Sequence, residues 1–227
     1  MKKNIFIAII AAAASLTSCA DFLEEAPVLS QSDVLTLSTY RGLDNAVAGA
    51  YAPLSSTGWY MGDFLFINEM KTVNGQKFMG GDWDTGRMTD WYKINYSSSK
   101  TSGIWSTAYF IIKSVNDVMD NLEGKGDEQD LNNLKAECLF LRAFCHFDLV
   151  RTYAQPFIQK KGATPGVPVI LHSDPDGKPA RNTVAEVYDQ IIADLEEAKS
   201  IIDPAYSRTG VTDKKAVVNI DVINAML

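Results

Sequence analysis

The sequence predicts an all-α fold with long irregular loops. Apolar residues recur at three- and four-residue steps in several long segments, which is the spacing of a helix face. Many of the glycines and prolines gather between those segments, and prolines lie within and around the one short apolar run that resembles a strand, residues 167–171. With 227 residues, of which 46% are hydrophobic, the chain can bury a sizeable core as one large domain or two small ones.

The first two predicted helices flank a glycine-rich segment. The first covers about residues 40–54, where Pro53 is typical of a stop, and its apolar stripe comprises Tyr40, Leu43, Ala46, Val47, Ala50, Tyr51 and Leu54. Residues 57–102 break this periodicity. The second helix begins near residue 104 and ends at Gly124-Lys125-Gly126, and its stripe comprises Ile104, Ala108, Ile111, Ile112, Val115, Val118, Met119 and Leu122.

The third predicted helix is the longest, over about residues 128–154, and Pro156 stops it. One face carries Leu131, Leu134, Cys138, Leu141, Cys145, Leu149 and Tyr153. After a proline-rich loop at residues 155–182, Thr183 and Glu186 have the spacing of a capping box and open a fourth helix. A fifth apolar run, residues 216–227, reaches the last residue without a cap, so we expect a chain that is incomplete at its C-terminus.

The N-terminus has the pattern of a bacterial lipoprotein signal. Lys2-Lys3 precede an apolar run of about ten residues, which as a helix is shorter than the ~30 Å hydrocarbon core of a bilayer. Leu16-Thr17-Ser18-Cys19 then resembles a lipobox. We therefore expect residues 1–18 to be a signal peptide, Cys19 to be lipidated, and residues 19–32 to be a tether. The alternative is a plain signal peptide with an incidental cysteine.

Charge and motifs exclude several classes of function. The chain has 21 Lys and Arg against 28 Asp and Glu, a net charge of −7, so it lacks the basic surface that nucleic acids need. It contains no GxSxG, P-loop or HExxH motif, and its two histidines and three cysteines leave little for a metal or triad site. We therefore predict a protein that is not an enzyme and uses no cofactor or metal.

Charged and reactive residues inside the third helix favour a structural interpretation. Cys138 and Cys145 are about 10 Å apart along the helix axis, too far for a disulfide. His146 points away from its neighbour Cys145, so we expect buried cysteines and a hydrogen-bonded core histidine rather than a metal pair. Arg142 is expected to pair with an acid on a neighbouring helix and fix the packing register, although ligand contact is the alternative.

The glycine-rich segment contains the candidate ligand site. Trp83, Trp91 and Tyr92 lie outside any apolar periodicity, next to Asp82, Arg87 and Asp90. Flat rings can stack on the C–H faces of sugars while such polar side chains bind the hydroxyl groups. The alternative is that the rings fill the core beneath a long loop. Residues 82–90 also resemble part of a calcium loop, but Lys93 stands where an EF-hand requires glutamate, so calcium is the weaker hypothesis.

The third helix carries a resemblance to a known family. Residues 136–153, AECLFLRAFCHFDLVRTY, closely resemble the signature helix of the SusD/RagB family. Residues 19–27, the first predicted helix up to Gly49-Ala50-Tyr51, and residues 166–169 and 183–195 resemble other family segments, so the likeness covers essentially the whole chain. The family comprises surface lipoproteins of Bacteroidota that capture glycans, or peptides in the RagB branch, for a SusC-like TonB-dependent transporter.

The resemblance implies a right-handed, TPR-like array of antiparallel helix pairs. Residues 33–227 would then be the N-terminal helical domain, because family members are considerably longer. The implied function is non-catalytic binding of oligosaccharides or polysaccharides at the outer-membrane surface and their delivery to the transporter. The alternatives are an interaction scaffold that docks on the transporter without binding glycans, and peptide capture.

Overall fold

The computed structural model describes residues 36–62, 64–65, 69, 98–174, 176–208 and 217–227. Within this part the fold is helical and contains no β-strand, only an isolated bridge between Pro165 and Thr183, which confirms the predicted fold class. Its helices are α3 (Tyr40–Tyr51), η2 (Ala52–Ser55), α6 (Ser98–Met119), α7 (Glu128–Tyr153), η3 (Gln159–Gly162), α8 (Val184–Ile201) and α9 (Ile220–Met226).

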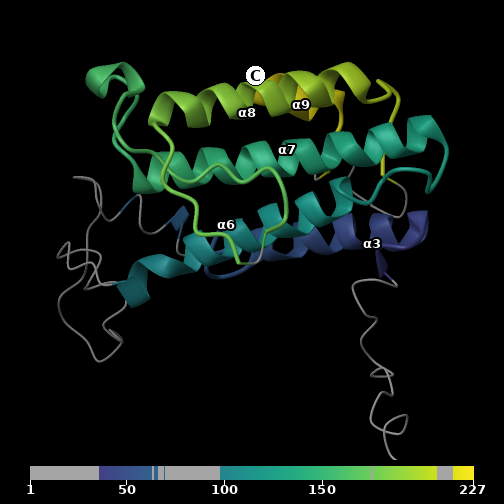
Figure 1. The fold of residues 1–227 in the computed structure, drawn as a ribbon, viewed down its shortest axis with the longest axis horizontal. Helices are drawn as coiled ribbons and strands as arrows, with labels where there is room; N and C mark the ends of the chain where they lie inside the picture. Colours follow the sequence, from purple (N-terminus) through teal and green to yellow (C-terminus); the bar gives the residue numbers. More distant parts are fainter. Residues whose placement is uncertain (1–35, 63, 66–68, 70–97, 175, 209–216) are drawn as a thin grey trace, which may run out of the picture. The chain divides into compact units, whose positions relative to one another are not determined.

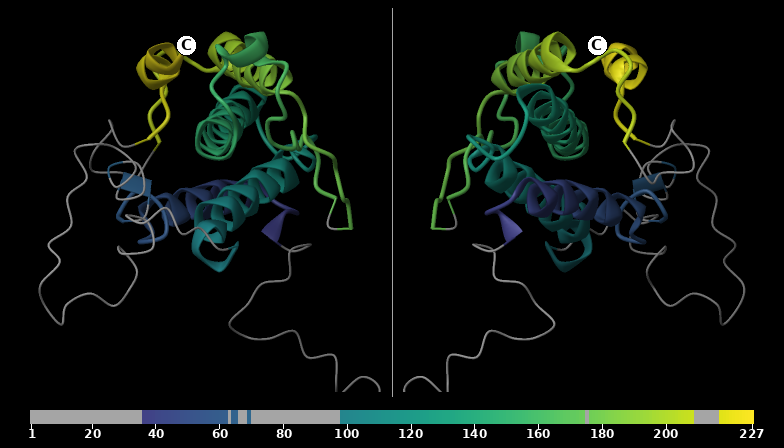
Figure 2. Two further views of the ribbon diagram at one scale, coloured as in Figure 1. Left: turned by 90° about the vertical axis from the view of Figure 1, so that its left-hand side faces the viewer. Right: turned by 90° about the vertical axis from the view of Figure 1, so that its right-hand side faces the viewer.

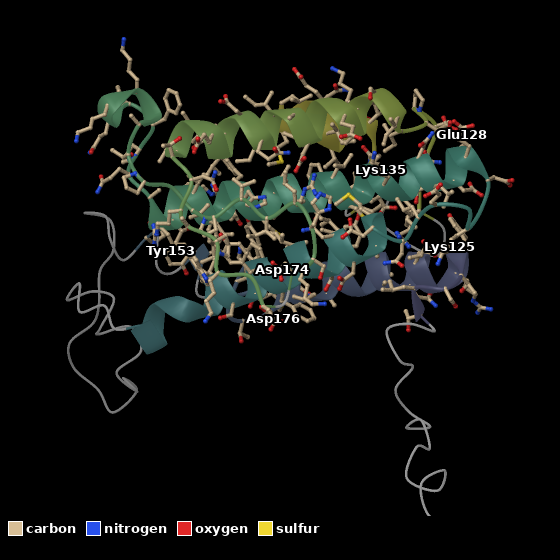
Figure 3. The ribbon with its side chains drawn as sticks, viewed as in Figure 1. Lys125, Glu128, Lys135, Tyr153, Asp174 and Asp176 are labelled. Atoms are coloured by element: carbon tan, nitrogen blue, oxygen red, sulfur yellow. The ribbon has the colours of Figure 1, made fainter. Side chains whose placement is uncertain are left out.

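Successive long helices are antiparallel neighbours (Figure 1). Helix α7 lies between α6 and α8, α3 packs on α6, and α9 packs on α8. The end views in Figure 2 show α7 beneath α8, with α6 and α3 on the other side of α7. Figure 3 labels Glu128 and Tyr153 at opposite ends of α7, which places the turn from α6 at one end and the long loop to α8 at the other.

Local sequence signals explain where these helices begin. The predicted capping box is confirmed, because the Thr183 hydroxyl accepts from the Glu186 amide at 3.2 Å while the Glu186 carboxylate accepts from the Thr183 amide at 2.8 Å. Asn219 caps α9 through its side-chain oxygen, so this helix begins at Ile220, later than the apolar run predicted. Helix α6 begins at Ser98, earlier than predicted.

Helix α7 is buried on more than one side, which corrects the expectation of a single apolar stripe. Packing against α6 and α8 on two sides, with further contacts to α3, covers most of its circumference. Its buried residues therefore include a polar set, namely Asn133, Glu137, Arg142, His146 and Asp148. Each of these needs a partner inside the protein, because burying an unpaired polar group costs free energy.

The loop between α7 and α8 starts with a left-handed turn. Lys160 and Lys161 have φ angles of 50° and 52°, and Gly162 follows with a φ of 78°. Glycine is required at this position because a Cβ atom there would lie 2.7 Å from the Phe157 ring. None of the described helices combines the length and the apolar character that a membrane-spanning helix needs.

Candidate functional site

The ligand residues predicted from sequence lie outside the described residues. These are Asp82, Trp83, Arg87, Asp90, Trp91 and Tyr92, and the proposed lipidation site Cys19 lies outside as well. The aromatic-loop, calcium and lipidation hypotheses therefore stay predictions. The described part of the chain offers a different candidate.

A cleft of about 360 Å³ lies between α6 and the loop that leads to α8. Its lining combines aromatic, apolar and charged side chains, namely Trp105, Tyr109, Lys113, Pro168, Ile170, His172, Ser173, Asp174, Gly177 and Pro179. Figure 3 labels Asp174 and Asp176 on the loop segment that passes in front of α6. Two parts of the chain that are about 60 residues apart therefore build one concave site.

Two aromatic side chains form the helical wall of the cleft. Trp105 and Tyr109 are one turn apart on α6, with ring centroids 5.0 Å apart and planes inclined at 53°. Tyr153 packs edge-on against Trp105 at 5.2 Å, and the Arg181 guanidinium lies 5.6 Å from its ring centroid. These contacts fix the half-buried rings in place, so the cleft presents a preformed surface on which a flat apolar face can pack.

Polar and charged side chains border this aromatic wall. Lys113 forms an ion pair with Asp117 at 2.6 Å, one turn further along α6. His172 on the loop meets the Asp120 carboxylate at 3.0 Å. Together with Asp174, these groups give a ligand with many hydroxyls both donors and acceptors of hydrogen bonds.

Side chains of α6 and of Asn182 hold the loop wall in place through hydrogen bonds to its backbone. The Tyr109 hydroxyl donates to the Pro168 carbonyl at 2.8 Å, and burial raises the pKa of this hydroxyl, so it stays a donor. Asn116 donates to the Ile170 carbonyl at 3.1 Å. Asn182 accepts from the Val169 amide at 3.0 Å. Three carbonyl or amide groups of a proline-rich segment thus find fixed partners.

Helix α7 supplies the remaining anchors from the core. Arg142 donates to the Leu171 carbonyl at 3.1 Å, and the Ile170 amide donates to His146 Nε2 at 3.3 Å. Arg142 also binds both carboxylate oxygens of Asp194 on α8, at 2.7 and 2.8 Å. The expectation that Arg142 pairs with an acid on a neighbouring helix is confirmed, and the same guanidinium positions the wall of the cleft.

The cysteines and the histidine of α7 are buried, as expected. Cys138 and Cys145 are unpaired thiols, and burial raises the pKa of both, so neither is a reactive thiolate at neutral pH. His146 is partnered at Nε2, whereas no group in the described structure meets hydrogen-bond geometry at its Nδ1. The described residues contain no group of three metal-ligating His, Cys, Asp or Glu side chains.

Asp148, another charged residue of α7, has a structural role. Its carboxylate accepts from Trp59 Nε1 at 2.9 Å, from the Tyr60 hydroxyl at 2.6 Å and from Arg151 at 2.6 Å. Burial raises its pKa, while these donors oppose that change. The cluster ties the segment after α3 to the end of α7.

Acidification is expected to destabilise the protein through His146. Burial, together with the nearby Arg142 guanidinium, lowers the pKa of this imidazole from 6.5 to about 4. The unfolded chain therefore binds a proton that the folded chain does not, and stability falls as the pH falls from 6.5 towards 4. At pH 5 the loss relative to pH 7 is about 2 kcal/mol.

Urea unfolding at pH 7 and pH 5 measures this effect. The control is His146→Gln, which keeps an acceptor for the Ile170 amide but does not titrate. We expect the variant to lose less stability on acidification than the native chain, by about 2 kcal/mol. Equal losses in the two proteins would contradict the assignment.

The sequence contains a signal for this cleft, but a weak one. Trp105 and Tyr109 are four residues apart, beside rather than within the predicted apolar stripe of Ile104 and Ala108. Aromatic residues one turn apart on the flank of a helix indicate a second contact surface. What the sequence does not show is that the loop around His172 covers that surface.

A protein-family model and a curated relative both match most of this chain. Residues 21–219 match the family model SusD-like_3, described as starch-binding associating with outer membrane. The SusD-like protein P2 of Formosa agariphila is 28% identical over 219 residues, which is 91% of this chain and 40% of that protein.

Solved structures show the same fold. A SusD superfamily protein from Bacteroides vulgatus is 34% identical, with a TM-score of 0.64, over 78% of this chain and 40% of that one. Another from Bacteroides thetaiotaomicron is 26% identical, with a TM-score of 0.68, over 83% and 41%. The chain thus spans about two-fifths of the length of these relatives.

Proposed function

Because this chain belongs to the SusD-like family, we propose that it binds oligosaccharides or polysaccharides at the cell surface without catalysing their conversion. In this proposal it delivers them to a SusC-like TonB-dependent transporter in the outer membrane. Residues 1–18 are the signal peptide, Cys19 carries the lipid anchor, residues 19–32 form the tether, and residues 33–227 form the binding domain.

The observation that supports glycan binding is the aromatic wall of the cleft with its polar border. Trp105 and Tyr109 offer ring surface to the C–H face of a sugar. Lys113, His172 and Asp174, which line the same cleft, offer partners for its hydroxyl groups. We propose that the aromatic loop, with Trp83, Trp91, Tyr92, Asp82, Arg87 and Asp90, provides a further part of the binding surface.

Alanine at Trp105 is expected to weaken glycan binding by about tenfold or more, equivalent to about 1.4 kcal/mol. The reason is the loss of the larger ring on the cleft wall, whereas Trp105→Phe should restore part of the affinity. Affinity gels containing neutral polysaccharides, followed by calorimetry with the glycan that retards the protein, measure the change. Phe110→Ala is the matched control, since Phe110 lies on the same helix, is 58% exposed and does not line the cleft.

The same assay tests the aromatic loop and the proposed function itself. Trp83→Ala and Trp91→Ala should each weaken binding with the fold intact, and unchanged affinity would remove that loop from the site. Retardation of the native chain by none of the glycans would contradict glycan capture. That outcome would favour the scaffold or the peptide-binding alternative.

A further inference from the structure

We infer that residues 155–161, the loop tip that follows α7, dock on an anionic lipid surface. This interaction goes beyond the proposed glycan binding and does not depend on it. It follows from the exposure, the charge and the backbone conformation of the loop tip.

The loop tip presents two large apolar side chains to solvent. All seven of its residues are exposed. Phe157 is 48% exposed and Ile158 is 88% exposed, which is the highest value among the described large apolar side chains. Figure 1 shows this turn, in green, beyond the end of the fold at which α8 begins. Apolar side chains that gather at an exposed site with polar neighbours mark a surface for a protein partner or a membrane.

Positive charge lies directly beside these apolar side chains. Lys160 and Lys161 follow Ile158 closely, and residues 149–173 contain no Asp or Glu, although the chain has 28 of them. Both lysines are exposed, and no described residue forms an ion pair with either, including Glu186 and Asp189 at the start of α8. Ammonium groups next to apolar side chains fit the phosphate groups and the acyl boundary of an anionic lipid surface.

The backbone of the loop tip is fixed in an unfavourable conformation. Lys160 and Lys161 have φ angles of 50° and 52°, a region that costs free energy for residues with a Cβ atom. The Gln159 amide donates to the Pro156 carbonyl at 2.9 Å, and the Ala163 amide donates to the Lys160 carbonyl at 3.2 Å. Backbone strain of this kind persists where the surrounding structure holds it, and it clusters at binding sites. The loop tip is therefore preformed and can bind without first being ordered.

Phe157 joins the loop tip to the helical body. Its ring packs edge-on against Tyr188 of α8, with ring centroids 5.8 Å apart. The rest of this ring and nearly the whole Ile158 side chain remain accessible. A contact made by the loop tip would therefore hold the body of the protein as well.

The small size of the loop tip favours a lipid surface over a protein partner. A stable protein interface uses about 20–30 residues on each side, whereas the loop tip has seven. A lipid surface needs no complementary shape, and the family of this chain associates with the outer membrane. Together with the lipid anchor proposed at Cys19, the loop tip would give the chain a second membrane contact. Two contacts restrict the orientation of a domain that one tether leaves free.

The decisive measurement places an environment-sensitive dye on the loop tip of the full chain. The dye is attached to Ile158→Cys in a Cys19→Ala background, where Cys138 and Cys145 are buried and stay unlabelled. Vesicles of phosphatidylcholine, alone or with an equal amount of phosphatidylglycerol, carry a lipid-borne quencher. At low salt we expect quenching about fivefold greater or more in the anionic vesicles. Equal quenching in the two kinds of vesicle, or none in either, would overturn the inference.

Matched variants test whether the lysines of the loop tip cause this binding. Lys160→Gln with Lys161→Gln should lower the quenching in anionic vesicles by about fivefold or more. Lys178→Gln with Lys199→Gln removes the same charge from two other exposed lysines and should lower it by less than about twofold. Equal effects of the two pairs would show that only net charge matters and would overturn the inference. So would equal quenching of a dye on Glu196→Cys, an exposed position of α8.

A further variant separates the lipid surface from a protein partner. Ile158→Ser should unfold in urea at the native midpoint, because this side chain is 88% exposed, and should bind anionic vesicles more weakly than the native chain. If the dye stays unquenched while Ile158→Ser reduces recovery of the transporter with the protein from detergent extracts, the loop tip is a protein interface and the lipid inference is wrong. Glycan binding by the same variant should be unchanged, so failure of this inference is distinguishable from failure of the proposed function.

Discussion

Replacing Arg142 with alanine is expected to lower the free energy of unfolding by about 3–5 kcal/mol. The substitution leaves the Asp194 carboxylate, whose side chain is 2% exposed, without the guanidinium that binds both its oxygens. It also removes the donor to Asn116 Oδ1 at 3.0 Å and to the Leu171 carbonyl. Urea unfolding at pH 7, followed by far-ultraviolet circular dichroism, measures the loss.

A double variant separates the buried charge from the rest of the interaction. In Arg142→Met with Asp194→Leu, both charges are absent and the space is filled, so we expect a smaller loss than for Arg142→Ala alone. The double variant should still speed hydrogen exchange of the Ile170 amide, which donates to His146, because the adjacent Leu171 carbonyl has lost its donor and this segment is held less firmly. A loss below about 1 kcal/mol for Arg142→Ala would contradict this account of the buried pair.

Glu137→Ala is expected to have an effect of similar size, about 3–5 kcal/mol, at the other polar cluster of α7. Glu137 is fully buried and accepts from the Tyr206 hydroxyl at 2.6 Å, from Arg208 Nε at 3.1 Å and from the Tyr51 hydroxyl. Burial raises the pKa of both tyrosines, so they remain donors and would be left unpaired.

Glu137→Gln is the matched control for this cluster. The amide keeps an acceptor oxygen for a tyrosine hydroxyl but removes the charge that faces Arg208, so an intermediate loss is expected. Arg208 also pairs with Asp44 at 2.6 Å, which links α3 to a residue 164 positions later. If the glutamine and alanine variants were equally stable, the stabilisation by Glu137 would come from its charge and not from its hydrogen bonds to the tyrosines.

Helix positions and ends were largely predictable because local rules decide them. The periodicity of residues 128–154 and the stop at Pro156 match α7, which ends at Tyr153. The capping box at Thr183 depends only on two side chains three residues apart. Such signals need no knowledge of the rest of the chain.

Tertiary pairings were less accessible to sequence reasoning. An acidic partner for Arg142 was predictable from the cost of a buried charge, but the identity of Asp194 among 28 acids was not. Likewise, Trp105 becomes part of a cleft only because a loop about 65 residues later crosses α6. The burial of α7 on two sides was not predictable from its pattern, because the residues that face its neighbours include polar and charged ones and do not form a single apolar stripe.

The firm attachment of residues 168–171 has a consequence for protein engineering. Residues 168–171 are the base of the loop, and their backbone is hydrogen-bonded to four side chains of α6 and α7, namely Tyr109, Asn116, Arg142 and His146. The rest of the loop, up to residue 179, therefore begins from a fixed base. A library that randomises the rest of the loop would keep this fixed base and the aromatic wall of Trp105 and Tyr109 unchanged. Such a scaffold permits retargeting to new ligands without redesign of the helices that carry it.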